Sequence, residues 1–165
     1  YKRQALWKLY TLYNMGVAVK KQAKSKSHDQ NNPLGRVLAV GEEHMGKDIE
    51  TLELKLAEAI MAERPAIERG TPVVKIISVV APLAGLLGTV TGMIVTFQQI
   101  TLFGTGDPKI MAGGISQALV TTVLGLVVAI PTTLLHSFAN SSARGIINVL
   151  EEQSTGIVAE HSDSK

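Results

Sequence analysis

The sequence lacks cysteine, and two long stretches lack any charged side chain. With no cysteine among 165 residues, disulfide bonds and thiolate metal sites are excluded. No Asp, Glu, Lys or Arg occurs in residues 76–106 or in residues 110–143. A soluble domain of this size would intersperse charged residues with its core residues. The two charge-free stretches therefore indicate a membrane protein, although the overall composition, with 45% hydrophobic and 18% charged residues, is ordinary.

These two stretches predict a hairpin of transmembrane helices. We expect spans at 73–103 and 110–138, each longer than the roughly 20 residues that cross a bilayer core. Residues 104–109 (Gly-Thr-Gly-Asp-Pro-Lys) form a short, turn-rich connector, so the spans should be antiparallel neighbours. Most Lys and Arg residues flank the hairpin, and the connector holds one Lys. The positive-inside rule then places both tails in the cytoplasm and the connector on the far side of the membrane.

Both tails predict helices outside the bilayer. Residues 1–32 are basic with interleaved aromatic residues, which is typical of a juxtamembrane segment following a preceding transmembrane helix. A solvated basic surface is the alternative, and no nucleic-acid partner is expected. A helical region is expected at 33–72 and an amphipathic helix at 139–165. Their apolar stripes need partner helices: Ile49, Leu52, Leu56, Ala59 and Ile60, then Ile146, Ile147, Leu150, Ile157 and Val158. The expected fold is all-α, with long transmembrane helices extending into a cytoplasmic bundle.

The connector also predicts which residues of the two spans share a depth. Its centre lies between Gly106 and Asp107, and this pairs Pro82 with Pro131 and Gly88 with Gly125. Two prolines at one depth are either irregularities tolerated by neighbouring helices or a hinge. Small residues let helix backbones approach closely in lipid, and the candidates for this packing are Gly85, Gly88, Gly92, Gly125 and Ala129.

Polar groups in the spans are hydroxyls and amides. Thr and Ser can donate to carbonyls of their own helix. The Gln117 amide cannot satisfy its hydrogen bonds on its own helix in this way, so it should face other helices or a lumen. Neither span contains a carboxylate or a buried lysine, so a proton pathway here would need an acid from a partner helix. We find no phosphate loop, metal-ligand cluster or nucleophile–base pair, and therefore expect no enzymatic activity, cofactor or metal.

Two stretches resemble the signatures of the ExbB/TolQ/MotA proton-channel family, and ExbB most closely. They are Ala81–Gly92 (APLAGLLGTVTG) and Ala112–Pro131 (AGGISQALVTTVLGLVVAIP), within a resemblance that covers about residues 33–160. It implies a homopentamer around a central pore. It also implies an ExbD-like single-span partner, two copies of which place helices in the pore, each with a proton-accepting aspartate. A TonB-like protein would transmit the work to outer-membrane receptors.

The resemblance assigns expectations to individual residues. Thr89 and Thr122 match pore-facing threonines of the family, and Pro82 and Pro131 match its paired prolines, which favours the hinge. Gln117 is expected to line the pore together with Thr89 and Thr122. It stands where many ExbB and TolQ relatives have Glu, and unlike Glu it cannot titrate. A TolQ-like role in envelope maintenance and a MotA-like stator are alternatives within the family. A non-conducting membrane scaffold is the alternative of another class, and Gln117 is the reason to retain it.

Overall fold

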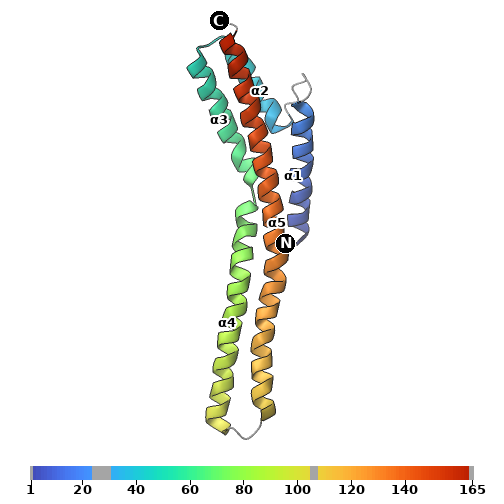
Figure 1. The fold of residues 1–165 in the computed structure, drawn as a ribbon, viewed down its shortest axis with the longest axis vertical. Helices are drawn as coiled ribbons and strands as arrows, with labels where there is room; N and C mark the ends of the chain where they lie inside the picture. The colour runs from blue at the N-terminus through green and yellow to red at the C-terminus, as the bar shows by residue number, and fades with distance from the viewer. Residues whose placement is uncertain (1, 24–30, 105–107, 164–165) are drawn as a thin grey trace. The chain divides into compact units, whose positions relative to one another are not determined.

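The computed structural model describes residues 2–23, 31–104 and 108–163, and every regular element in these ranges is helical (Figure 1). The all-α prediction is thereby confirmed. The chain divides into two compact units, one of residues 1–71 and 137–165 and the other of residues 72–136. The helices are α1 (Lys2–Gln22), α2 (Pro33–His44), α3 (Ile49–Glu68), α4 (Thr71–Phe103) and α5 (Pro108–Asp163).

The first unit is built around one apolar core to which α1, α2, α3 and the C-terminal part of α5 contribute. Its buried residues are Leu12, Val19, Leu34, Val37, Leu52, Leu56, Ile60, Ile67, Ala139, Ala143, Ile146, Ile147 and Leu150. The two stripes predicted from helical spacing supply much of this core, and their packing on partner helices is confirmed. Full burial of each Leu or Ile side chain contributes roughly 1.5–3 kcal/mol.

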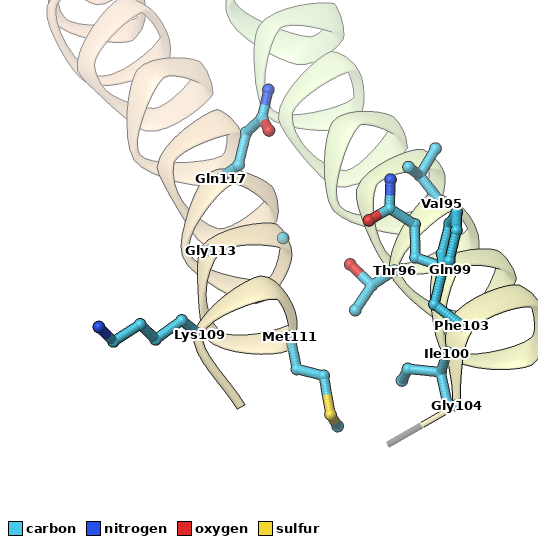
Figure 2. A pocket seen from close by; sticks show the side chains of 11 residues that line it. Val95, Thr96, Gln99, Ile100, Phe103, Gly104, Lys109, Met111, Gly113 and Gln117 are labelled. Atoms are coloured by element: carbon cyan, nitrogen blue, oxygen red, sulfur yellow. The ribbon is translucent and has the colours of Figure 1, made fainter. Parts of the chain in front are cut away.

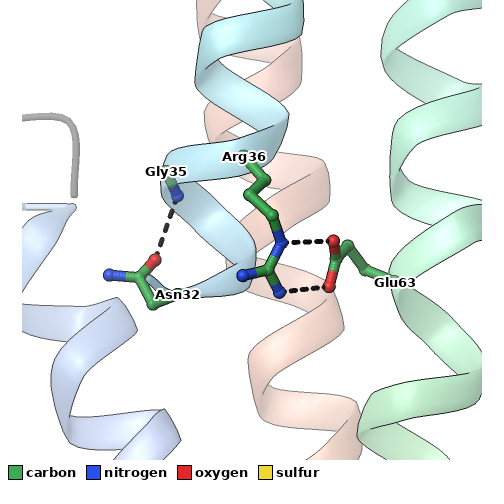
Figure 3. Close-up of polar contacts among 4 residues, drawn as sticks. All are labelled: Asn32, Gly35, Arg36 and Glu63. Carbon is green, nitrogen blue, oxygen red and sulfur yellow. Dashed lines mark hydrogen bonds and ion pairs between the residues drawn. The ribbon is translucent and has the colours of Figure 1, made fainter. Parts of the chain in front are cut away.

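Helices α2 and α3 begin at side-chain caps. The Asn32 side-chain oxygen accepts the Gly35 backbone N–H at 3.0 Å (Figure 3), and Pro33 follows at the first helical position. Asp48 accepts the backbone N–H and the hydroxyl of Thr51, both at 2.9 Å. Such caps satisfy amide donors that have no partner within the helix.

An ion pair joins α2 to α3. Arg36 Nε lies 2.6 Å from Glu63 Oε1, and a second guanidinium nitrogen lies 2.7 Å from Oε2 (Figure 3). The hydrogen bonds to Glu63 raise the pKa of Arg36 above its ordinary value. The paired geometry matches the planar guanidinium to the planar carboxylate and fixes the two helices side by side.

Helix α1 has one face in the core and one exposed face. Leu12 and Val19 are buried, whereas Trp7, Tyr10 and Tyr13 are largely exposed. These three aromatic residues therefore do not belong to the core. Their location at a membrane interface remains a prediction.

The second unit is a hairpin of α4 and the N-terminal part of α5. Both helices are long and apolar enough to cross a membrane. Helix α4 ends where Gly104 adopts a φ of 72°, a left-handed conformation that glycine tolerates. Residues 105–107 of the predicted connector lie outside the described residues, and Pro108 already begins α5. Helix α5 continues without a break through the predicted second span and the predicted C-terminal helix.

Candidate functional site

Small residues line the contact between α4 and α5. A Cβ atom at Gly88 would lie 2.5 Å from Thr121 Oγ1, and one at Gly92 would lie 2.8 Å from the Ala118 Cβ. A Cβ atom at Gly125 would lie 2.8 Å from the Ala81 carbonyl oxygen. Real Cβ atoms do not approach other atoms so closely, so the helices meet at this separation because these positions are glycine.

The observed register differs from the predicted one. Gly88 packs against Thr121, four residues from the predicted Gly125, and Gly125 packs against Gly85 and Ala81. The offset is about one helical turn. Part of its cause is that proline is well tolerated at the start of a helix, so Pro108 begins α5 and the connector is shorter on that side than predicted.

The two prolines consequently move out of the predicted pairing. Pro82 lies inside α4 and Pro131 inside α5, and each helix continues past its proline. With the observed register, neither proline is level with the other. A proline removes one amide donor and leaves the carbonyl four residues earlier without its usual partner, so each helix has its own weakened turn.

Thr121 connects the two helices directly. Its hydroxyl lies 3.2 Å from the Gly85 carbonyl oxygen of α4 and 2.6 Å from the Ala118 carbonyl oxygen of its own helix. One hydroxyl proton is thus shared between an interhelical and an intrahelical acceptor. Gly85 also lies against Thr122, since a Cβ atom at Gly85 would be 3.2 Å from the Thr122 Cα.

Most other threonine hydroxyls in the hairpin donate to their own helix, as predicted. Thr89 donates to the Leu86 carbonyl at 2.7 Å, and similar bonds are made by Thr91, Thr96, Thr101, Thr132 and Thr133. Thr122 is different, because its hydroxyl makes no hydrogen bond to the described part of the chain. Its proton and lone pairs are available to another molecule.

A groove runs along one flank of the hairpin and contains Gln117. Its part near the connector has a volume of about 410 Å³ and is lined by Gln99 of α4 and Gln117 of α5, among others (Figure 2). An adjoining part of about 290 Å³ includes Gln117, Thr91 and Val95. We call these two parts the amide groove. Gln117 is exposed, and its side chain makes no hydrogen bond to the residues described.

The structure does not bring all three predicted pore residues together. Five residues separate Gln117 from Thr122, which is about 140° around an α-helix, and the contact face through Ala118 and Thr121 lies between them. Neither Thr89 nor Thr122 lines the amide groove. By the same helical geometry, Thr89 lies on the flank of α4 away from the groove. Thr89 and Thr122 therefore share one flank, and Gln117 occupies the other.

The outer surface of the hairpin is apolar. Large side chains such as Leu87, Phe97 and Leu124 are exposed, whereas Ala118 and Ala129 on the contact side are buried. The residues that the structure describes between positions 76 and 136 include no Asp or Glu. The residues that the structure describes also contain no cluster of His, Asp and Glu able to hold a metal ion.

Sequence reasoning missed several contact residues of α5. Gly114, Ala118 and Thr121 contact Thr96, Gly92 and Gly88 respectively. Their spacing of four and three residues continues to Gly125, and this small-residue period was a usable signal. The amide of Gln99 was likewise recognisable as polar, but only the structure places it in the same groove as Gln117.

Comparison with known proteins identifies the family. Residues 29–152 match the MotA/TolQ/ExbB proton channel family. The chain is 45% identical over 89 residues to the putative biopolymer transport protein ExbB-like 3 of Synechocystis sp., covering 53% of this chain and 41% of that protein. It is 32% identical over 120 residues to the putative biopolymer transport protein ExbB homolog of Methanothermobacter thermautotrophicus, covering 73% and 42%.

A third relative is the biopolymer transport protein ExbB of Pseudomonas putida, 37% identical over 95 residues that cover 57% of this chain and 29% of the relative. The chain spans less than half the length of each of these three proteins. The family match itself covers most of the chain. The protein is therefore a membrane protein with two candidate spans that belongs to the MotA/TolQ/ExbB proton channel family, whose members are transport proteins and not enzymes.

Proposed function

We propose that this protein is an ExbB-like subunit of a motor driven by the proton motive force in the bacterial inner membrane. Its hairpin would form the wall of a pore around helices of an ExbD-like partner, and a TonB-like protein would carry the work to transport across the outer membrane. Family membership supports the proton-channel part of this proposal. The names of the relatives, as biopolymer transport proteins, support the transport part.

One observation carries the proposal: the Thr122 hydroxyl makes no hydrogen bond within the described chain, in a hairpin whose described spans have no carboxylate. A hydroxyl in an apolar membrane needs a partner. A carboxyl group on an inserted helix would be such a partner, because it can accept from Thr122 when ionised and donate to it when protonated. The flank with Thr89 and Thr122 is accordingly the one we assign to the pore.

Other features fit the same assembly. Exposed apolar side chains around the hairpin call for lipid or for further copies of the chain, and the homopentamer of the family would supply both contacts. Basic residues in the tails favour a cytoplasmic location for 1–72 and 139–165, with 104–109 in the periplasm. The weakened turns at Pro82 and Pro131 would then lie toward the cytoplasmic side and allow the helices to bend.

The role of Gln117 follows from its flank. If Thr122 faces the pore, Gln117 faces a neighbouring helix, where its amide can both donate and accept. In that position it holds helices together and does not carry protons. Replacement of the family's common Glu by Gln would then leave conduction intact.

The test measures proton uptake into liposomes that contain the full-length protein and its ExbD-like partner. Thr122→Val should lower the partner-dependent uptake at least tenfold while the complex still assembles, and Thr122→Ser should restore most of it. Thr132→Val is the matched control, because the Thr132 hydroxyl already donates to the Val128 carbonyl at 2.6 Å. Uptake that is unchanged in Thr122→Val would remove Thr122 from the pathway.

A non-conducting scaffold is the second candidate. The observation in its favour is the absence of any titratable group, apart from His136, in residues 76–106 and 110–143. If the protein is a scaffold, the partner would still assemble with it, but the liposomes that contain the complex would take up no protons. The same liposome assay separates the two functions, since a scaffold gives no partner-dependent uptake even in the unmodified protein.

A further inference from the structure

A pocket of about 460 Å³ lies between α1 and the C-terminal end of α3. Its walls have mixed chemistry: an indole, a guanidinium and a hydroxyl surround an apolar floor. The lining residues are Trp7, Thr11, Leu12, Met15, Ala66, Ile67 and Arg69. We call this the Arg69 pocket. It belongs entirely to the first unit, and nothing in the proposed proton pathway uses it.

The pocket lies next to the start of a membrane span along the chain. Arg69 lies two residues before Thr71, where the candidate span α4 begins. Tryptophan and arginine are the side chains that favour the headgroup zone of a bilayer. Trp7 is the only tryptophan of the chain. The residue is 67% exposed although its side chain is large and mostly apolar. An exposed indole at this level is best placed against lipid.

The chemistry of the lining suits a phosphodiester with attached acyl chains. A guanidinium binds phosphate oxygens through two parallel hydrogen bonds. The Thr11 hydroxyl donates to the Trp7 carbonyl at 2.8 Å, which leaves its oxygen free to accept from a ligand hydroxyl. Leu12 and Ile67 are almost fully buried and form a floor that a free phosphate ion would not need.

Charge on α1 favours an anionic ligand. The helix carries five Lys or Arg residues and no Asp or Glu. Each cation near an anionic bilayer surface strengthens binding about fivefold. We propose that the Arg69 pocket binds one anionic phospholipid of the phosphatidylglycerol type. Arg69 binds the phosphodiester, Trp7 lies at the glycerol level, and Leu12, Met15 and Ile67 contact the first acyl carbons.

The experiment is a lipid titration of the purified full-length protein in detergent, followed by native mass spectrometry. Phosphatidylglycerol and phosphatidylcholine with identical acyl chains are compared. We expect phosphatidylglycerol to bind each subunit at least fivefold more tightly, and Arg69→Gln to remove this preference. Arg64→Gln is the matched control, because Arg64 lies on α3 five residues before Arg69 but does not line the pocket. Arg69→Lys should keep an intermediate preference.

A second measurement reports on the pocket itself. Quenching of Trp7 fluorescence by brominated phosphatidylglycerol is obtained by subtracting the signal of Trp7→Phe. It should exceed quenching by brominated phosphatidylcholine in the unmodified protein and not in Arg69→Gln. Equal binding of the two lipids, an unchanged preference in Arg69→Gln, or displacement of the lipid by millimolar inorganic phosphate would each overturn the proposal. The readout is lipid binding, so its failure is separate from any failure of the proton-pathway proposal.

Discussion

The Thr121 hydroxyl lies 3.2 Å from the Gly85 carbonyl oxygen, a contact that spans 36 residues of sequence and joins the two helices of the hairpin. Gly88 lies on the same side of α4, and a Cβ atom there would meet the Thr121 side chain at 2.5–3.0 Å. One threonine therefore combines an interhelical hydrogen bond with close packing between the two helices. In lipid, contacts of this kind replace the hydrophobic driving force that holds soluble helices together.

Replacing Thr121 by valine should destabilise the hairpin only slightly. The Gly85 carbonyl normally accepts a helical hydrogen bond within α4, so Thr121→Val leaves no acceptor unpaired. We expect a loss of about 0.5–1 kcal/mol, measured as a shift of the unfolding transition in a detergent–SDS titration. Thr101→Val serves as the control, because Thr101 donates only to the Phe97 carbonyl of its own helix. An equal loss in both variants would show that the interhelical bond contributes nothing.

Replacing Gly88 by alanine should destabilise the hairpin more strongly. The added methyl group overlaps Thr121, and forcing atoms into a packed contact costs about 1–3 kcal/mol. Gly113→Ala is the matched control in the neighbouring helix, since a Cβ atom there meets nothing within 4 Å. That substitution should be neutral or stabilising by up to about 1 kcal/mol, because alanine is the better helix former. The same titration measures both.

The steric clash expected in Gly88→Ala can also be relieved by a second substitution, in α5. All three atoms nearest to the added Cβ belong to the Thr121 side chain. Gly88→Ala combined with Thr121→Gly should therefore be more stable than Gly88→Ala alone. Gly125→Ala has no such rescue, because its added Cβ meets the backbone oxygen of Ala81. Failure of the double variant to recover stability would contradict the observed register.

The Arg36–Glu63 pair should contribute modestly to the first unit. The Arg36 side chain is 44% exposed and that of Glu63 is 15% exposed, so solvent screens the pair. A double-mutant cycle with Arg36→Gln and Glu63→Gln should give a coupling of about 0.5–1 kcal/mol that shrinks at high salt. The Lys55–Glu58 pair, with side chains 41% and 68% exposed, is the comparison, and its removal should leave the unfolding midpoint unchanged. A coupling that is insensitive to salt would argue against an electrostatic origin.

The sequence was most informative where the spacing or composition of a single segment was enough to predict its helix. The stripe through Leu52, Leu56 and Ile60 predicted a helix with one buried face, and these residues are buried on α3. The two charge-free stretches likewise predicted the hairpin. These features depend on local pattern and composition, and both can be read without knowledge of tertiary contacts.

The register of the hairpin could not be read in the same way. It depends on where each helix ends, and Pro108 shifted that end into the expected connector. A shift of one turn preserves the small-residue pattern, so the pairing of Gly88 with Gly125 and that of Gly88 with Thr121 are equally plausible from sequence. Only the interlocking of Gly88, Gly92 and Gly125 with specific atoms distinguishes them.

The division of polar residues between two flanks was also beyond the sequence. Thr122 and Gln117 both occupy α5 and both are polar, and resemblance alone grouped them in one pore lining. The contact face must be known before either residue can be assigned to a side. Once it is known, Thr122 and Gln117 acquire different expected partners, and their substitutions should affect different properties.

The most direct test of the central claim measures proton flux in liposomes that contain the full-length protein alone or together with its ExbD-like partner. The described hairpin contributes hydroxyls and amides but no carboxylate, so we predict no flux above that of empty liposomes for the protein alone. Flux should appear when the partner is added and disappear when the carboxylate in the partner's membrane helix is replaced by its amide. Proton flux through the protein without any partner would contradict the account.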